Sequence, residues 1–205
     1  MCCAALGTDT LASIRLPAAY CGVTGLKASH GLASIRNIIP VAESLDHVGP
    51  LCRSVADTAY MLQAMAGFDP LDPVSIRAAR SNYAEALLQP VESLRIGLPN
   101  GDYFSRLHLD TEQAVSNALE LFGSITTGSR EVSLPPVPDF SPLLAESYAW
   151  HENYLDDETN HSQYDPVTLE RLLAAGAVST DDYIRAQQDM IRSRNLIQEV
   201  FNEVD

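Results

Sequence analysis

Positive charge is scarce in this sequence of 205 residues, which has one lysine and 13 Lys and Arg residues in all against 27 Asp and Glu. The net charge of −14 argues against binding to nucleic acid or to an anionic membrane, because phosphate recognition needs clustered Lys and Arg. Long apolar runs are also missing, and none approaches the roughly 20 residues that a membrane-spanning helix needs. We therefore predict a protein that binds neither nucleic acid nor membrane.

Cysteine is used sparingly, and its spacing excludes a disulfide framework. The four cysteines are Cys2, Cys3, Cys21 and Cys52. None forms a Cys-x-x-Cys motif, and the adjacent Cys2 and Cys3 are poorly placed to bridge each other. The N-terminus has no charged segment before an apolar core, so nothing in it indicates secretion. We predict reduced thiols and a cytoplasmic location.

Metal-binding motifs are missing as well. The five histidines show no His-x-x-x-His or His-Glu spacing suited to zinc. The acidic run at 156–158 is typical of an exposed, solvated loop rather than of a calcium site. We therefore predict that the protein holds no metal and no cofactor.

What the sequence does contain indicates an α/β fold. Its hydrophobic fraction of 46% is enough to bury a sizeable core. Capping residues and apolar periodicity predict helices at 54–66, 110–123, 165–175 and 179–204. Runs rich in Val, Ile, Leu or Tyr predict strands at 20–26, 94–98 and 130–134. A helix between the last two strands suggests a crossover unit, hence a mixed or parallel sheet covered by helices.

One segment carries a more specific signal. Residues 7–27 read Gly-Thr-Asp-Thr-Leu-Ala-Ser-Ile-Arg-Leu-Pro-Ala-Ala-Tyr-Cys-Gly-Val-Thr-Gly-Leu-Lys. Three further runs follow: Glu-Ser-Leu-Asp-His-Val-Gly-Pro-Leu at 43–51, Arg-Ser-Val-Ala-Asp-Thr-Ala at 53–59 and Ala-Gly-Phe-Asp-Pro-Leu-Asp-Pro at 66–73. In order and spacing these motifs resemble the amidase signature family, and together they cover residues 5–73.

The resemblance implies an α/β/α core of the amidase signature type, with residues 1–205 forming part of a single amidase domain. The Lys segment and the Gly-Gly-Ser-Ser-Gly segment that precede the nucleophile in that family have no counterpart in this sequence. The strand that usually follows the last helix is not found either. We therefore expect a domain that is incomplete at both ends.

The resemblance also assigns roles to residues around the first motif. It implies that Ser13 is the nucleophile that forms an acyl-enzyme. A serine hydroxyl needs a base to remove its proton and donors to hold the charge on the carbonyl oxygen. In the family a lysine acts as base through a second serine, and the backbone N–H groups of the oxyanion hole correspond here to Thr10, Leu11, Ala12 and Ser13. Asp9 and Arg15 resemble a structural pair beside this loop.

The motif departs from the family pattern at two glycines, which Leu11 and Ala12 replace. Glycine is favoured where φ is positive or where substrate approaches closely, so we expect a distorted or occluded oxyanion hole. Lys27 follows the nucleophile, whereas the family's catalytic lysine precedes it, and we do not expect Lys27 to be the base. A Ser-His-acid arrangement with His30 or His47 is an alternative, although their spacing does not support it.

Three functions are consistent with these motifs. The first is the hydrolysis of carboxylic amides, with a small-molecule amide as substrate. The second is an inactive remnant or binding scaffold, which the missing base favours for the isolated chain. The third is a protein like the amidotransferase A-subunit, whose members usually follow Gly-Leu-Lys with Pro-Thr-Tyr-Gly-Arg-Val-Ser where this sequence reads Ala-Ser-His-Gly-Leu-Ala-Ser at 28–34. Self-association into a homo-oligomer is a further expectation, because an incomplete sheet leaves uncovered edges.

Overall fold

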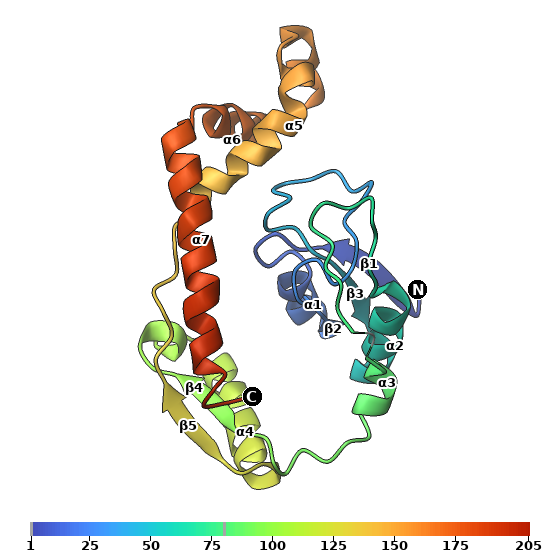
Figure 1. Ribbon diagram of the computed structural model, residues 1–205, viewed down its shortest axis with the longest axis vertical. Helices are drawn as coiled ribbons and strands as arrows, with labels where there is room; N and C mark the ends of the chain where they lie inside the picture. The colour runs from blue at the N-terminus through green and yellow to red at the C-terminus, as the bar shows by residue number, and fades with distance from the viewer. Residues whose placement is uncertain (1, 80) are drawn as a thin grey trace. The chain divides into compact units, whose positions relative to one another are not determined.

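A computed structural model describes residues 2–79 and 81–205 (Figure 1). The chain divides into two compact units, each built from two stretches of sequence. The first unit comprises Met1–Leu88 and Ser141–Tyr183, and the second comprises Gln89–Phe140 and Ile184–Asp205. Each unit is described separately, and a single partial domain over 1–205 stays a prediction.

The first unit is built around a small antiparallel sheet of three strands, β1 (Ala4–Thr8), β2 (Thr24–Gly25) and β3 (Val48–Cys52). The strand order is β1-β3-β2, with Thr8 opposite Val48 and Thr24 opposite Cys52. The middle strand β3 is the most buried of the three, since all of its residues except Leu51 are buried. The sheet therefore places the end of β1, where the candidate nucleophile loop begins, beside the start of β3.

Helix α1 (Arg15–Cys21) corrects part of the sequence-based prediction. The sequence predicts a strand at 20–26, but only Thr24–Gly25 pairs with a neighbouring strand. The buried carboxylate of Asp9 accepts hydrogen bonds from the backbone N–H groups of Ile14 and Arg15, which satisfies the start of the helix. Gly22 ends the helix in the left-handed conformation, with φ of 63°. The carboxylate of Asp9, which lies outside the helix, thus supports a helical start that overrides the β propensity of Tyr20.

The other helices of the first unit agree with the sequence signals where those signals are local. The prediction for 54–66 is confirmed by α2 (Val55–Met65), which is capped by Ser54 and packs on β3. The prediction for 165–175 is confirmed by α6 (Pro166–Gly176), whose cap is Asp165. Besides α1, the sequence analysis does not predict α3 (Tyr83–Ala86) or α5 (Ala145–Leu155). Short 3-10 turns lie at Ser141–Leu144 and Glu158–Gln163.

The second unit contains the predicted crossover. Strands β4 (Ile96–Pro99) and β5 (Ser129–Val132) pair in parallel, and α4 (Leu109–Ile125) lies between them in the chain. A 3-10 turn at Asp102–Phe104 precedes α4. The last helix, α7 (Thr180–Val200), begins in the first unit and contributes most of its length to the second. The sequence predicts that this helix ends at 204, whereas it ends four residues earlier, at Val200.

The α/β class is confirmed, with helices accompanying small sheets (Figure 1). Parallel and antiparallel pairs both occur, and they lie in separate sheets rather than in one. Across the described residues, no helix has the length and apolar character needed to cross a membrane.

Candidate active site

The Ser13 loop, defined here as residues 9–14, connects β1 to α1 and holds the candidate nucleophile. Ser13 is exposed and lies in the turn directly before α1. Within the described chain its side chain makes no hydrogen bond, and the backbone N–H groups of Leu11, Ala12 and Ser13 have no protein acceptor. The loop therefore presents a hydroxyl and several unused donors to an incoming ligand.

Asp9 anchors this loop at its buried end. Its side chain is fully buried, and its Oδ2 accepts from the backbone N–H of Ile14 at 3.2 Å and from Arg15 Nε at 3.1 Å. Its Oδ1 accepts from Lys27 Nζ at 2.9 Å. Burial alone would raise the pKa of Asp9, but the hydrogen bonds from Arg15, Lys27 and Ile14 outweigh it and hold the pKa well below the usual range. Asp9 is thus a buried anion at neutral pH.

Lys27 is held in place by the same anchor. Besides Asp9, its ammonium donates to the backbone carbonyl of Thr10 at 2.7 Å, and its side chain is only 17% exposed. The ammonium is therefore already engaged as a hydrogen-bond donor to a carboxylate and to a backbone carbonyl. This geometry argues for a structural role of Lys27, which the sequence analysis did not connect to Asp9.

Thr10 is also held by a residue that the sequence analysis left without a role. Its Oγ1 donates to Asp46 Oδ1 at 2.5 Å, and Asp46 is 3% exposed. Asp46 belongs to the run at 43–51, so the motif itself was the signal available in the sequence. The first and second motifs therefore meet at this hydrogen bond.

Leu11 and Ala12 adopt ordinary backbone conformations. Among the described residues other than glycine, only Asn37 has a positive φ. The backbone thus passes through the loop without the positive φ that glycine favours, and the expected distortion of the oxyanion hole stays a prediction. The Leu11 carbonyl accepts a hydrogen bond from Arg15 Nη2, while the Leu11 side chain is 61% exposed. Occlusion by this side chain stays a prediction.

The two histidines considered as alternative bases are occupied elsewhere. His47 Nδ1 lies 2.6 Å from the Leu45 carbonyl, and His30 Nε2 lies 3.1 Å from the Glu43 carbonyl. Their rings meet edge to face at 5.1 Å. Neither ring is hydrogen-bonded to Ser13 in the described chain. The geometry gives no support to a Ser-His-acid arrangement.

His47 predicts a pH dependence of stability. Burial, together with Lys27 and His30, lowers the pKa of His47 from 6.5 to about 4, against the raising effect of the Leu45 carbonyl and Asp9. As the pH falls, the unfolded chain takes up a proton on this ring before the folded chain does. The contribution of the neutral ring to folding stability is therefore complete above pH 6.5 and is lost as the pH falls from 6.5 towards 4. The loss is at most about 3 kcal/mol.

We expect the variant His47→Asn, which keeps a donor for the Leu45 carbonyl, to show a smaller fall in unfolding free energy between pH 7 and pH 4.5. Urea titrations measure the unfolding free energy of both proteins. The signal is the fluorescence of the only tryptophan, Trp150, which lies in the first unit. Parallel curves for the two proteins over this range would contradict the assignment.

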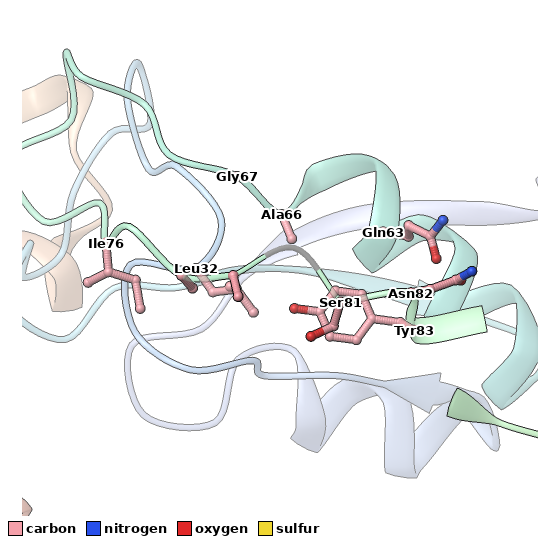
Figure 2. Close-up of a pocket in the computed structure, with 10 residues that line it drawn as sticks. Leu32, Gln63, Ala66, Gly67, Ile76, Ser81, Asn82 and Tyr83 are labelled. Atoms are coloured by element: carbon pink, nitrogen blue, oxygen red, sulfur yellow. The ribbon is translucent and has the colours of Figure 1, made fainter. Parts of the chain in front are cut away.

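A cavity of the first unit lies away from these residues. It has a volume of about 340 Å³, and Figure 2 shows its lining between the end of α2 and the segment before α3, including Leu32, Gln63, Ile76 and Tyr83. None of the residues of the Ser13 loop lines it. The described part of the chain also contains no group of three or more His, Cys, Asp or Glu arranged to hold a metal ion.

Comparison with known proteins agrees with the motifs. The chain matches the amidase family over residues 1–205, and it belongs to that family. It is 34% identical to an amidase of Pseudomonas putida over 212 residues, which cover 100% of this chain and 45% of that protein. It is 42% identical to the A-subunit of glutamyl-tRNA(Gln) amidotransferase from Hahella chejuensis over 135 residues, which cover 66% of this chain and 28% of that protein.

Solved structures give the same result. The chain superposes with a TM-score of 0.87 and 30% identity on a protein from an inhibitor-bound vestigial complex related to the origins of an s-triazine catabolic enzyme, over 98% of this chain and 44% of the other. It superposes on a peptide amidase bound to the competitive inhibitor chymostatin with a TM-score of 0.71 and 30% identity, over 91% and 44%. The chain thus spans less than half the length of these relatives.

Proposed function

We propose that this chain carries the nucleophile and oxyanion loop of an enzyme that hydrolyses carboxylic amides through a serine acyl-enzyme. The observation that supports this most directly is the Ser13 loop itself. It combines an exposed serine with adjacent backbone N–H groups that have no acceptor among the described residues, on a support fixed by the buried Asp9.

In the proposed reaction, Ser13 Oγ attacks the carbonyl carbon of the amide while its proton passes to a base. The N–H groups of Thr10, Leu11, Ala12 and Ser13 are the candidate donors to the oxyanion that forms. Collapse of this intermediate breaks the C–N bond, and the leaving amine takes up a proton. Water then hydrolyses the ester on Ser13, which releases the carboxylic acid and restores the hydroxyl.

The base is the component that these residues do not supply. Lys27 is the only lysine, and its ammonium is engaged by Asp9 and by the Thr10 carbonyl. We therefore propose that the 205 residues alone do not hydrolyse unactivated amides, which keeps the role of an inactive remnant or scaffold open for the isolated chain. Asp9 and Arg15 support the loop in this proposal and take no part in bond breaking.

A role like that of an amidotransferase A-subunit is the second candidate, and the 42% identity to the Hahella chejuensis protein favours it. The net charge of −14 argues against direct contact between this chain and nucleic acid. In either role the group bound beside Ser13 is an amide, and the substrate would be a small molecule.

Acylation by an activated ester tests Ser13 without requiring a strong base. We expect p-nitrophenyl acetate to acetylate Ser13 in the 205-residue chain, as located by peptide mass spectrometry, while p-nitroacetanilide is hydrolysed no faster than in buffer. Ser13→Ala should abolish the labelled peptide. The matched control is Ser116→Ala, which removes an exposed serine of α4 and should leave labelling unchanged. Labelling of other residues with Ser13 unmodified would contradict the assignment.

A further inference from the structure

Asp46 connects two segments that are far apart in the sequence. Its Oδ1 accepts from Thr10 Oγ1 at 2.5 Å, across 36 residues of chain. Its Oδ2 accepts from the backbone N–H groups of Val41 and Ala42, at 2.8 and 3.1 Å. Asp46 itself is 3% exposed, so its carboxylate makes these bonds from a buried position. One carboxylate thus closes its own turn and also holds the Ser13 loop.

The contact falls at the point where the loop leaves the sheet. Asp9 and His47 exchange two backbone hydrogen bonds, from Asp9 N to the His47 carbonyl at 2.9 Å and from His47 N to the Asp9 carbonyl at 3.2 Å. Thr10 and Asp46 are the next residues outward on each segment. Their side-chain bond therefore extends the pairing of β1 and β3 by one further link.

Beyond Thr10 the backbone donors are free until the start of α1. The N–H groups of Leu11, Ala12 and Ser13 have no protein acceptor in the described chain, whereas the N–H of Ile14 is bound by Asp9. Two buried carboxylates thus hold the two ends of the donor row, Asp46 through Thr10 at one end and Asp9 at the other. Misplacement of such donors by about 1 Å is costly for catalysis.

We propose that Asp46 is a positioning residue for the Ser13 loop, which fixes the direction of the N–H groups from Leu11 to Ser13 by holding the Thr10 hydroxyl. The inference rests on the proposed function for its catalytic consequence. It adds a residue, and a role for the second sequence motif, that the reaction as written above does not include.

The variant Thr10→Val isolates this link, because it removes the hydroxyl with little change in shape and leaves Asp46 bound to Val41 and Ala42. Thr10→Ser keeps a hydroxyl at this position and serves as the rescue variant. If Thr10→Val does not fold, Thr10→Ala removes the hydroxyl with a smaller side chain. The matched control is Ser34→Ala, which breaks another hydroxyl–carboxylate bond of the first unit, between Ser34 Oγ and Asp69 at 2.9 Å.

The first measurement is ¹⁵N relaxation of the 205-residue chain. We expect backbone order parameters near 0.85 for residues 11–13 in the parent, Thr10→Ser and Ser34→Ala proteins, and values below about 0.6 in Thr10→Val and Thr10→Ala. The values for 41–42 should not change. Unchanged order at 11–13 after removal of the hydroxyl would overturn the proposal, whatever the activity of Ser13.

The second measurement is the rate of Ser13 acetylation as a function of ester concentration. Thr10→Val should lower the limiting rate by about 10-fold to 100-fold and change the apparent dissociation constant less than twofold, with Thr10→Ser close to the parent. An equal loss in Thr10→Ser, or a loss confined to binding, would overturn the positioning role. If the parent protein is not acetylated at Ser13, the proposed function fails, and the relaxation result still decides whether Asp46 orders the loop.

Discussion

Replacing Ser13 by alanine in a composite amidase is expected to lower kcat by on the order of 10⁴-fold or more, because the acyl-enzyme can then no longer form. The other hydroxyl of the loop, that of Thr10, is bonded to the buried Asp46. In this composite, the 205 residues replace the stretch of the Pseudomonas putida amidase that they match, which is 45% of that protein. In the proposed reaction Lys27 is not the base, so the remainder of the relative is included as the proposed source of that base. Hydrolysis of p-nitroacetanilide, followed by absorbance, measures kcat and KM for the parent composite and its variants.

The composite also separates the candidate functions. Ser116→Ala removes an exposed serine of α4 and should leave kcat unchanged. Retention of kcat within tenfold by Ser13→Ala would exclude Ser13 as the nucleophile. A composite that folds and is acetylated at Ser13 by an activated ester, yet hydrolyses no amide, would favour the inactive remnant.

The elements that could be predicted from the sequence are those with local signals. Asp165 and Pro166 determine the start of α6, and Ser54 caps α2 by accepting a hydrogen bond from the backbone N–H of Asp57, three residues later. Helix α1 could not be predicted in this way, because its first N–H groups are satisfied by the carboxylate of Asp9, which is itself stabilised by Lys27. Where the cap depends on a tertiary ion pair, propensity alone favours the wrong structure.

For the site, the sequence identified the loop and the supporting pair of Asp9 and Arg15, but not the bonds made by Lys27 and Asp46. Ser13 and its donors follow from the resemblance of residues 7–27, and the roles of Thr10, Leu11 and Ala12 in holding an oxyanion stay predictions. The bond from Thr10 to Asp46 spans 36 residues and that from Lys27 to Asp9 spans 18, so no local spacing rule reveals either. Leu11 and Ala12 pass through the loop with negative φ, and the distorted or occluded oxyanion hole expected from them stays a prediction.

Asp9→Asn is expected to lower the free energy of unfolding of the first unit by about 3–5 kcal/mol at pH 7, because it leaves the ammonium of Lys27 without its buried partner. Lys27 is 17% exposed and Asp9 is fully buried, so water cannot replace the lost carboxylate. By contrast, Arg15→Gln should cost no more than about 1 kcal/mol, since the Arg15 side chain is 49% exposed. Arg36→Gln, at the half-exposed ion pair with Asp69, is the matched control and should behave like Arg15→Gln.

The dependence of this effect on pH distinguishes the loss of a charge from a simple loss of packing. The folded pKa of Asp9 lies below its unfolded value, so its stabilising contribution is present above pH 4 and is lost as the pH falls through the folded pKa. The difference between the parent protein and Asp9→Asn should therefore shrink below pH 4, where the unfolded parent chain takes up a proton that asparagine cannot bind. Urea titrations at pH 7, 5 and 3.5, followed by Trp150 fluorescence, measure this difference. A difference that is the same at all three values would mean that Asp9 supports the loop by its shape, and the buried anion would not be what holds Ser13 in place.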